Sequence, residues 1–190
     1  LAGSISMSIL FAYISSASFV FLTYYGLDKA TFSLLFAVNA SGMISGSYLN
    51  GVFARRYNYL KVANVAVYIL IVLTGAILLA VIINPHLSYV WTVVAVFSTL
   101  FTVGIINPNA TAASLLDFKH NSGTASALSG AMRMAGGAFA AALIGFFQGE
   151  STTGMFLLIF LLALMVLIFL KMADRVRRHR EVIISNDLYT

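Results

Sequence analysis

One arginine lies in the middle of a long run of small and apolar residues. Residues 121–139 read NSGTASALSGAMRMAGGAF, and Arg133 is the only charged residue among them. A guanidinium stays ionised in a protein, and a charge inside a bilayer is costly unless it faces the interior of a bundle. Two interpretations follow. Either Arg133 is structural, bonded to backbone carbonyls or snorkelling inward, or it lines a polar cavity and contacts substrate or a coupling carboxylate.

The residues around Arg133 fall on two contrasting faces of a helix. Small residues share one narrow face with the arginine at steps of four, three, four and three: Ser126, Gly130, Arg133, Gly137 and Ala140. Bulky apolar residues share the opposite face: Leu128, Met132, Phe139, Leu143 and Phe146. Because small residues let a neighbouring helix approach closely, the pattern predicts a packing helix whose arginine points into the bundle.

A second stretch repeats this arrangement without a charge. Asn39, Gly42, Gly46 and Asn50 share one helical face, and GMISG forms a pair of glycines four residues apart. We therefore predict helix packing through Gly42, Gly46, Gly130 and Gly137.

The other residues capable of chemistry do not form a catalytic or metal site. The three histidines, His86, His120 and His179, lie in connections or in the tail, so no serine–histidine pair can meet inside the membrane. The acids all lie in loops, near helix ends or in the tail: Asp28, Asp117, Glu150, Asp174, Glu181 and Asp187. The chain has no cysteine. We therefore expect no enzyme activity, no metal and no cofactor.

The composition is that of a membrane protein. The chain is 61% hydrophobic and only 9% charged, with a mean hydropathy of +0.96, whereas a soluble domain is nearer one quarter charged. The net charge of +5 does not indicate nucleic-acid binding, because the charges form short clusters between apolar blocks.

Six apolar blocks are long enough to cross a bilayer as helices. They are residues 3–23, 31–53, 62–83, 89–112, 123–147 and 154–172. We predict an all-α membrane protein, with a six-helix bundle over residues 1–172 and a basic tail over residues 173–190. Because the chain begins with Leu1, we expect a piece of a longer polypeptide, with an independent half as the alternative.

Lysine and arginine counts predict the orientation. The second and fourth connections and the tail hold nine of these residues, Arg55, Arg56, Lys61, Lys119, Lys171, Arg175, Arg177, Arg178 and Arg180. The opposite connections hold only Lys29. Positive loops stay in the cytoplasm, so we expect both ends of this segment to be cytoplasmic.

The helices follow one order twice: a mixed helix, a small-faced helix and an apolar helix. This order favours a 3+3 inverted repeat, as in each half of a major facilitator transporter. The third and sixth blocks are apolar nearly all round, so we expect them at the periphery. The fourth block contains Pro108 in its inner part, which predicts a kink there.

Three stretches together resemble the drug:proton antiporters of the Bcr/CflA type, the bicyclomycin and chloramphenicol resistance branch of the major facilitator superfamily. FAYISSASFVFLTYYGLDKATFSLLFAVNASGMISGSYLN resembles the seventh and eighth spans of that family, and NPNATAASLL followed by SGTASALSGAMRMAGGA resembles the tenth and eleventh. The resemblance covers most of residues 9–145. It implies the C-terminal half of a twelve-helix antiporter that exports amphipathic drugs from bacteria.

The resemblance also implies where the functional residues lie. The proton-coupling acid of the family belongs to the N-terminal half, and the proton gradient is the energy source. The candidate cavity-lining residues are Tyr13, Asn39, Asn107, Asn109 and Arg133. The family usually has a neutral polar residue near the position of Arg133, so a cation there is expected to alter substrate choice.

One loop resembles the gating loop of the superfamily only in part. The stretch GVFARRYNYLK has Arg55 where the motif has aspartate and Asn58 where it has its second glycine. Arg55 and Arg56 therefore predict a basic cytoplasmic loop without a working charge relay.

The expected function is thus half of a proton-coupled multidrug exporter that works by alternating access in the bacterial inner membrane. Its partners would be amphipathic substrates, protons, lipid and the N-terminal six-helix half. Two alternatives remain open: a carrier of a small metabolite from the same superfamily, or a helical membrane subunit that does not transport.

Overall fold

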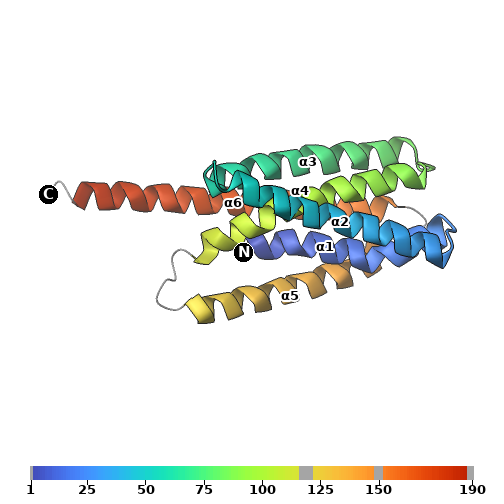
Figure 1. Cartoon of the computed structure of the whole chain (residues 1–190), viewed down its shortest axis with the longest axis horizontal. Coiled ribbons are helices and arrows are strands. Elements are labelled where there is room, and N and C mark those ends of the chain that lie inside the picture. Colours follow the sequence, from blue (N-terminus) through green and yellow to red (C-terminus); the bar gives the residue numbers. More distant parts are fainter. Residues whose placement is uncertain (1, 116–121, 148–151, 188–190) are drawn as a thin grey trace.

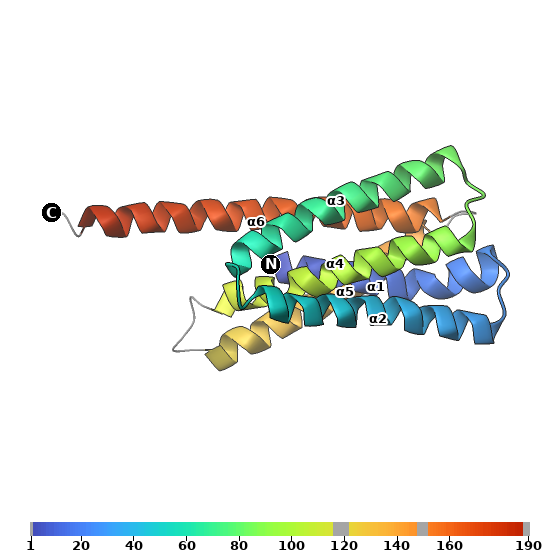
Figure 2. The same cartoon turned by 45° about the horizontal axis from the view of Figure 1, so that its top comes forward.

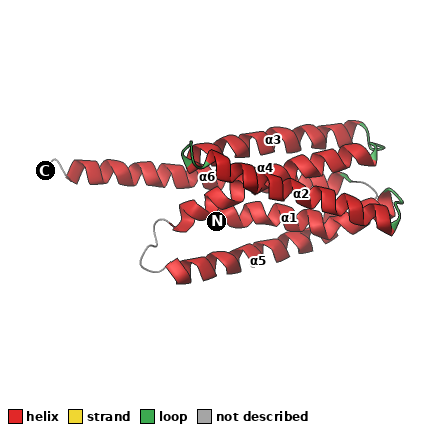
Figure 3. Cartoon of the chain, viewed as in Figure 1, coloured by secondary structure: helices red, strands yellow, loops and turns green. Residues whose placement is uncertain are grey.

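The computed structural model describes residues 2–115, 122–147 and 152–187, and most of them are helical (Figure 1, Figure 3). The elements are α1 (Ala2–Ser18), the π-helical segment η1 (Phe19–Tyr24), α2 (Lys29–Phe53), α3 (Tyr59–Ile83), α4 (Tyr89–Leu115), α5 (Ser122–Phe147) and α6 (Thr153–Asp187). These ranges contain no strand. They contain six spans long and apolar enough to cross a membrane, with α1 and η1 counted together. The predicted all-α fold is confirmed over this part of the chain.

The last helix is longer than its apolar block. α6 continues to Asp187, through residues that the sequence assigned to a tail. Residues 155–187 include no glycine or proline, so nothing in the backbone stops the helix where the apolar block ends. This end of α6 projects beyond the other helices in Figure 1.

The six helices form three layers, and the middle layer is the pair α1 and α4. α1 and α4 contact each other in the middle; α3 and α6 pack together on one side of them. On the other side, α2 packs on α4 and α5 packs on α1, whereas α2 and α5 do not pack against each other. Figure 2 shows α3 and α6 along the top of the bundle and α2 along the bottom.

The largest contacts between helices are related by a two-fold exchange. Exchanging α1 with α4, α2 with α5 and α3 with α6 turns the α2–α4 contact into the α5–α1 contact. The same exchange turns the α3–α4 contact into the α6–α1 contact and leaves the α1–α4 and α3–α6 contacts unchanged. This is the arrangement expected of two three-helix repeats of opposite topology.

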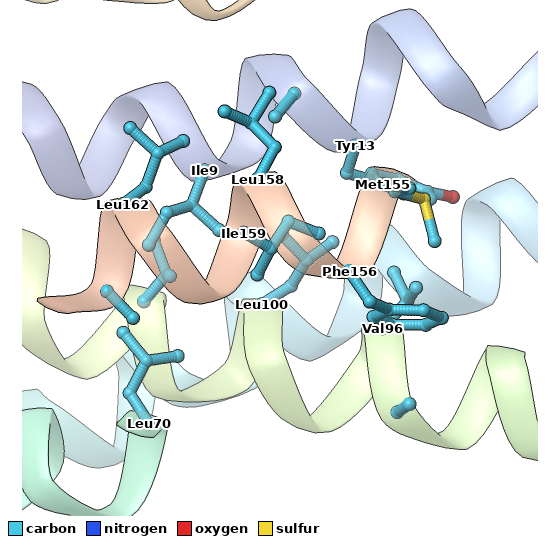
Figure 4. Packing of buried hydrophobic residues seen from close by; sticks show 14 of the residues in the cluster. Ile9, Tyr13, Leu70, Val96, Leu100, Met155, Phe156, Leu158, Ile159 and Leu162 are labelled. Atoms are coloured by element: carbon cyan, nitrogen blue, oxygen red, sulfur yellow. The ribbon is translucent and has the colours of Figure 1, made fainter. Parts of the chain in front are cut away.

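The hydrophobic core lies among α1, α3, α4 and α6. Its largest fully buried side chains come mainly from these helices and include Ile9, Leu70, Leu100, Phe156 and Ile159 (Figure 4). By contrast, α2 buries only Asn39, Gly42, Gly46 and Asn50. The apolar sixth block, expected at the periphery, therefore supplies one wall of the core, because a helix that is apolar all round suits protein contact as well as lipid.

Glycines bring α2 and α4 into backbone contact. A Cβ on Gly42 would lie 2.7 Å from the carbonyl oxygen of Phe97, and a Cβ on Gly46 would meet the carbonyl oxygen of Phe101. From the facing helix, a Cβ on Gly104 would meet the carbonyl oxygen of Met43. The close approach is thus reciprocal, with glycines on both helices.

The α5–α1 contact uses glycines on α5 against side chains on α1. A Cβ on Gly137 would meet the ring of Phe11, and one on Gly136 would lie 2.8 Å from Ser8 Oγ. A Cβ on Gly130 would have nothing within 4 Å. No described residue therefore packs against Gly130, and its role in helix packing stays a prediction.

Pro108 lies inside α4, which continues to Leu115. A proline has no N–H, so the carbonyl four residues earlier, at Gly104, loses its helical donor. Ser47 Oγ of α2 donates a hydrogen bond to that carbonyl at 3.1 Å. The break in the α4 ladder is therefore repaired from the neighbouring helix, as the absence of water in a bilayer requires.

The connection between α1 and α2 is bonded to the connection between α3 and α4, at the end of the bundle away from the projecting end of α6 (Figure 1). Asp28 caps α2 by accepting hydrogen bonds from the N–H groups of Ala30 and Thr31 at 3.0 and 3.1 Å. The hydroxyl of Thr31 also donates to the carboxylate, and these bonds lower the pKa of Asp28 below its ordinary value. Nearby, Tyr25 donates to the carbonyl of Leu87 at 3.0 Å and joins this connection to the one after α3.

Candidate functional site

A tyrosine–asparagine pair joins α1 to α2. Asn39 Nδ2 donates to the hydroxyl of Tyr13 at 3.0 Å, and the Tyr13 ring stacks on Phe36 with ring centres 5.7 Å apart. Both polar side chains are buried. Because α1 and α2 make few other contacts, this pair is a main connection between them.

Arg133 makes the corresponding connection in the second repeat. Its Nη2 donates to Thr111 Oγ1, which joins α5 to α4. The guanidinium also lies close to Gly3 of α1, where an added Cβ would be 3.5 Å from Nη2. On the opposite face of α5, Leu128 and Phe139 are 61% and 67% exposed. The arginine therefore faces the central helix pair, as its position among the glycines predicts.

The two polar connections are related by the repeat. The exchange that maps α1 onto α4 and α2 onto α5 maps the Tyr13–Asn39 contact onto the Thr111–Arg133 contact at the level of helices. In each repeat one polar pair thus spans two consecutive helices that otherwise scarcely touch. The second repeat differs by carrying a positive charge.

Two asparagines of α4 point to different neighbours. Asn109 Nδ2 donates to Asn50 Oδ1 of α2 at 2.6 Å and to the carbonyl of Ile105 at 2.8 Å. Asn107 Nδ2 lies 3.1 Å from Met7 Sδ of α1. The two asparagines flank Pro108. Asn109 therefore contributes to the α2–α4 contact and Asn107 to the α1–α4 contact.

The five residues expected to line one cavity do not form one exposed cluster. Tyr13, Asn39, Asn107 and Asn109 are buried within this chain, so here they join helices rather than present polar atoms to a solute. Arg133 alone of the five is partly exposed. The structure brings Tyr13 and Asn39 together and keeps them apart from the Asn109–Asn50 pair.

Three of these side chains keep a buried polar atom without a hydrogen-bond partner in the described part of the chain. The atoms are Asn39 Oδ1, Asn107 Oδ1 and Arg133 Nε. An unpaired buried polar atom costs about 1–3 kcal/mol, and such atoms in a native protein call for an explanation, often functional. These three lie on α2, α4 and α5.

The candidate gating residues lie in the connection between α2 and α3. Arg55 and Arg56 are exposed, and the chain turns there before Asn58 caps α3 by accepting from the N–H of Leu60 at 2.9 Å. Their position at the basic end of the bundle agrees with a loop that faces an aqueous phase. Their role in gating remains a prediction.

Sequence reasoning missed two hollows that flank α3. A cavity of about 670 Å³ lies between α2, α3 and α4, and its mostly apolar lining includes Lys61. A second cavity of about 810 Å³ lies between α3 and α6 and includes Lys171 and Arg175. Such hollows depend on the angles between helices, which residue periodicity does not report. Neither cavity includes any of the five candidate cavity residues.

The described residues contain no group of three histidine, cysteine or acidic side chains placed to hold a metal ion. The site therefore offers hydrogen-bond donors and acceptors and one fixed cation. Such groups can bind and orient a solute.

Comparison with known proteins places this arrangement in a family. The Major Facilitator Superfamily matches residues 1–141. The chain is also 29% identical over 135 residues to a protein of Bacillus subtilis (strain 168) described as "Uncharacterized MFS-type transporter YdgK". That similarity covers 71% of this chain and 33% of the relative, so the chain spans about a third of the relative's length. The chain therefore belongs to the Major Facilitator Superfamily, a family of multi-pass membrane transporters rather than enzymes.

Proposed function

We propose that this chain is the C-terminal half of a proton-coupled exporter of amphipathic drugs that works by alternating access. The observation that carries the proposal is the pair of three-helix repeats, whose open side lies between α2 and α5. A second six-helix half facing that side would enclose a path between the halves, and rocking of the halves would expose it alternately.

The energy source in this proposal is the proton gradient, and the titrating group lies outside this chain. All six acids of the chain lie in connections, near helix ends or in the tail. Arg133 cannot replace them, because a guanidinium does not release its proton in a protein. The coupling carboxylate is therefore assigned to the N-terminal half.

Arg133 is the residue we assign to substrate. It is partly exposed, faces the central helices and keeps Nε without a partner among the described residues. A solute with a hydrogen-bond acceptor would be attracted to this fixed cation. The buried pair Tyr13–Asn39 joins α2 to α1, so we assign it the role of positioning α2.

A transport assay on the full-length protein tests the proposal. Cells that express it should accumulate less of an amphipathic drug than cells that do not, and dissipating the proton gradient should abolish the difference. Equal accumulation in both strains with the gradient intact would refute the exporter.

The role of Arg133 needs a separate comparison. Arg133→Ala should lower drug transport per folded molecule by about tenfold, equivalent to about 1.4 kcal/mol. Met134→Ala is the matched control, because Met134 is the next residue and is 59% exposed. If Arg133→Ala reduces the amount of folded protein but leaves transport per molecule unchanged, Arg133 is structural.

A second candidate function is a carrier of a small anionic metabolite. Arg133 favours it, since the described part of the chain gives this fixed cation a hydroxyl partner rather than a carboxylate. Competition on the purified full-length protein separates the two. Inhibition of transport by organic anions and not by neutral or cationic drugs would favour the metabolite carrier.

The proposed location is the bacterial inner membrane with both ends of this segment in the cytoplasm. Because the chain has no cysteine, single cysteines at Arg55 and at Lys29 can report sidedness. A membrane-impermeant thiol reagent added to intact cells should label the Lys29→Cys variant and spare the Arg55→Cys variant. The reverse result would invert the orientation.

A further inference from the structure

We propose that the cavity between α3 and α6 binds the headgroup of an anionic phospholipid. This inference does not depend on the substrate or the direction of transport. The cavity has a volume of about 810 Å³ and is lined by Asn64, Tyr68, Ile168, Lys171, Met172, Asp174 and Arg175. Ligand sites typically measure about 300–1,000 Å³. It lies on the side of the bundle opposite to α2 and α5, so it is separate from the proposed substrate path.

The charges of the cavity favour a phosphate. Lys171 and Arg175 are both exposed and one turn apart on α6, so both cations can reach one headgroup. The single acid of the lining, Asp174, accepts a hydrogen bond from Asn64 Nδ2 at 2.9 Å. The lining therefore carries two positive charges against one negative charge whose carboxylate is already engaged by α3.

An aromatic ring fixes one of the cations. The Lys171 ammonium lies 5.7 Å from the centre of the Tyr68 ring, a distance at which the face of the ring attracts a cation. The lysine is thereby held over the cavity. This contact and the Asn64–Asp174 bond both join α3 to α6, so the site is built from two helices.

The remaining lining residues match the acyl part of a lipid. Ile168 and Met172 are 55% and 57% exposed; Ile168 precedes the charged turn of α6, and Met172 lies within it, next to Lys171. These apolar side chains and cations lie together at the end of a membrane-spanning segment. A phospholipid bound there would place its acyl tails beside the apolar side chains and its phosphate beside the cations. A soluble anion would use only the cations.

Quenching of a local tryptophan by brominated lipid tests the proposal. Tyr68→Trp places the reporter in the cavity and retains a ring for Lys171. Trp91, the single tryptophan of this chain, and any tryptophan elsewhere in the full-length protein are changed to phenylalanine. The protein is reconstituted into vesicles with dibrominated phosphatidylglycerol or dibrominated phosphatidylcholine. The apparent affinity for the anionic lipid should be about threefold higher than that for phosphatidylcholine. In the double variant K171Q/R175Q the two apparent affinities should be about equal.

Two controls keep the outcome decisive. Lys61→Gln removes a cation from α3 at the same end of the bundle but outside this cavity, and should leave the lipid preference unchanged. Equal emission of all variants in brominated phosphatidylcholine verifies that they fold. Equal quenching by the two lipids, or a preference that survives K171Q/R175Q, would overturn the proposal. Loss of the preference on adding inorganic phosphate at constant ionic strength would assign the cations to a soluble anion and would also overturn it.

Discussion

The α2–α4 pair and the α5–α1 pair, which the repeat relates, are held together by different kinds of contact. In the α2–α4 pair, glycines on both helices bring backbone against backbone, and two hydrogen bonds cross the contact. In the α5–α1 pair, glycines of α5 face side chains of α1, chiefly Phe11 and Ser8. The α2–α4 contact is therefore made by backbone atoms, which have fixed positions, whereas the α5–α1 contact is made by side chains that can change rotamer. The difference indicates a rigid α2–α4 unit and a more adaptable α5.

The largest expected effect comes from adding one methyl group to the rigid pair. Gly46→Ala should lower the free energy of unfolding of the full-length protein by about 3 kcal/mol, the upper end for overpacking. The reason is that the new Cβ meets the carbonyl oxygen of Phe101, a backbone atom. Unfolding in mixed detergent micelles measures it. A loss no greater than that of Gly137→Ala would remove the proposed contrast.

The adaptable pair should suffer less from the same change. Gly137→Ala should cost about 1.5 kcal/mol, since the side chain of Phe11 can move away from the added methyl by changing its χ1 rotamer. A double-mutant cycle with Phe11→Ala checks this reason, because removing the ring should abolish most of the cost. A cost that is the same with and without the ring would place the strain elsewhere.

The hydrogen bond between Asn50 and Asn109 should make a smaller contribution. Interhelical side-chain bonds in membranes are worth about 0.6 kcal/mol on average and about 1.7 at most. We therefore expect a coupling energy of about 1 kcal/mol from Asn50→Ala, Asn109→Ala and the double variant, measured by the same unfolding assay. A coupling energy of zero would mean that the glycines alone determine the rigidity of this pair.

The smallest effect is expected at Gly130. A methyl group there meets nothing within 4 Å in this chain, so Gly130→Ala should not destabilise the protein and should raise the free energy of unfolding by about 0.5 kcal/mol, the lower end of the gain from glycine to alanine in a helix. This variant also serves as the control for Gly46→Ala, since both replace a helical glycine. A large loss in the full-length protein would show that another part of it covers this face of α5.

Residue patterns predict the helices and their faces well in this chain. The lengths of the apolar blocks give six spans, and the spacing of small residues identifies the face that α2 turns toward α4. These features follow from bilayer thickness and helical periodicity, which are local properties. The length of α6 was missed because the end of an apolar block is not the end of a helix.

The site is less predictable than the fold. The position of Arg133 on the small-residue face indicates its direction, but not that Thr111 would be its partner. The candidate residues Tyr13 and Asn39 pair with each other and are buried, and spacing within one helix cannot reveal pairing between helices. The same limit explains Gly130, which lies on the predicted face beyond the reach of any described neighbour.

The hydrogen bond from Ser47 to the carbonyl that Pro108 leaves unpaired has a mechanical consequence. Any bending of α4 about this proline opens or closes the gap beside Gly104, and the donor that fills the gap belongs to another helix. α4 therefore cannot flex by itself without stranding a carbonyl in hydrocarbon. When α4 flexes, α2 therefore has to move with it, because the Ser47 hydroxyl joins the two helices.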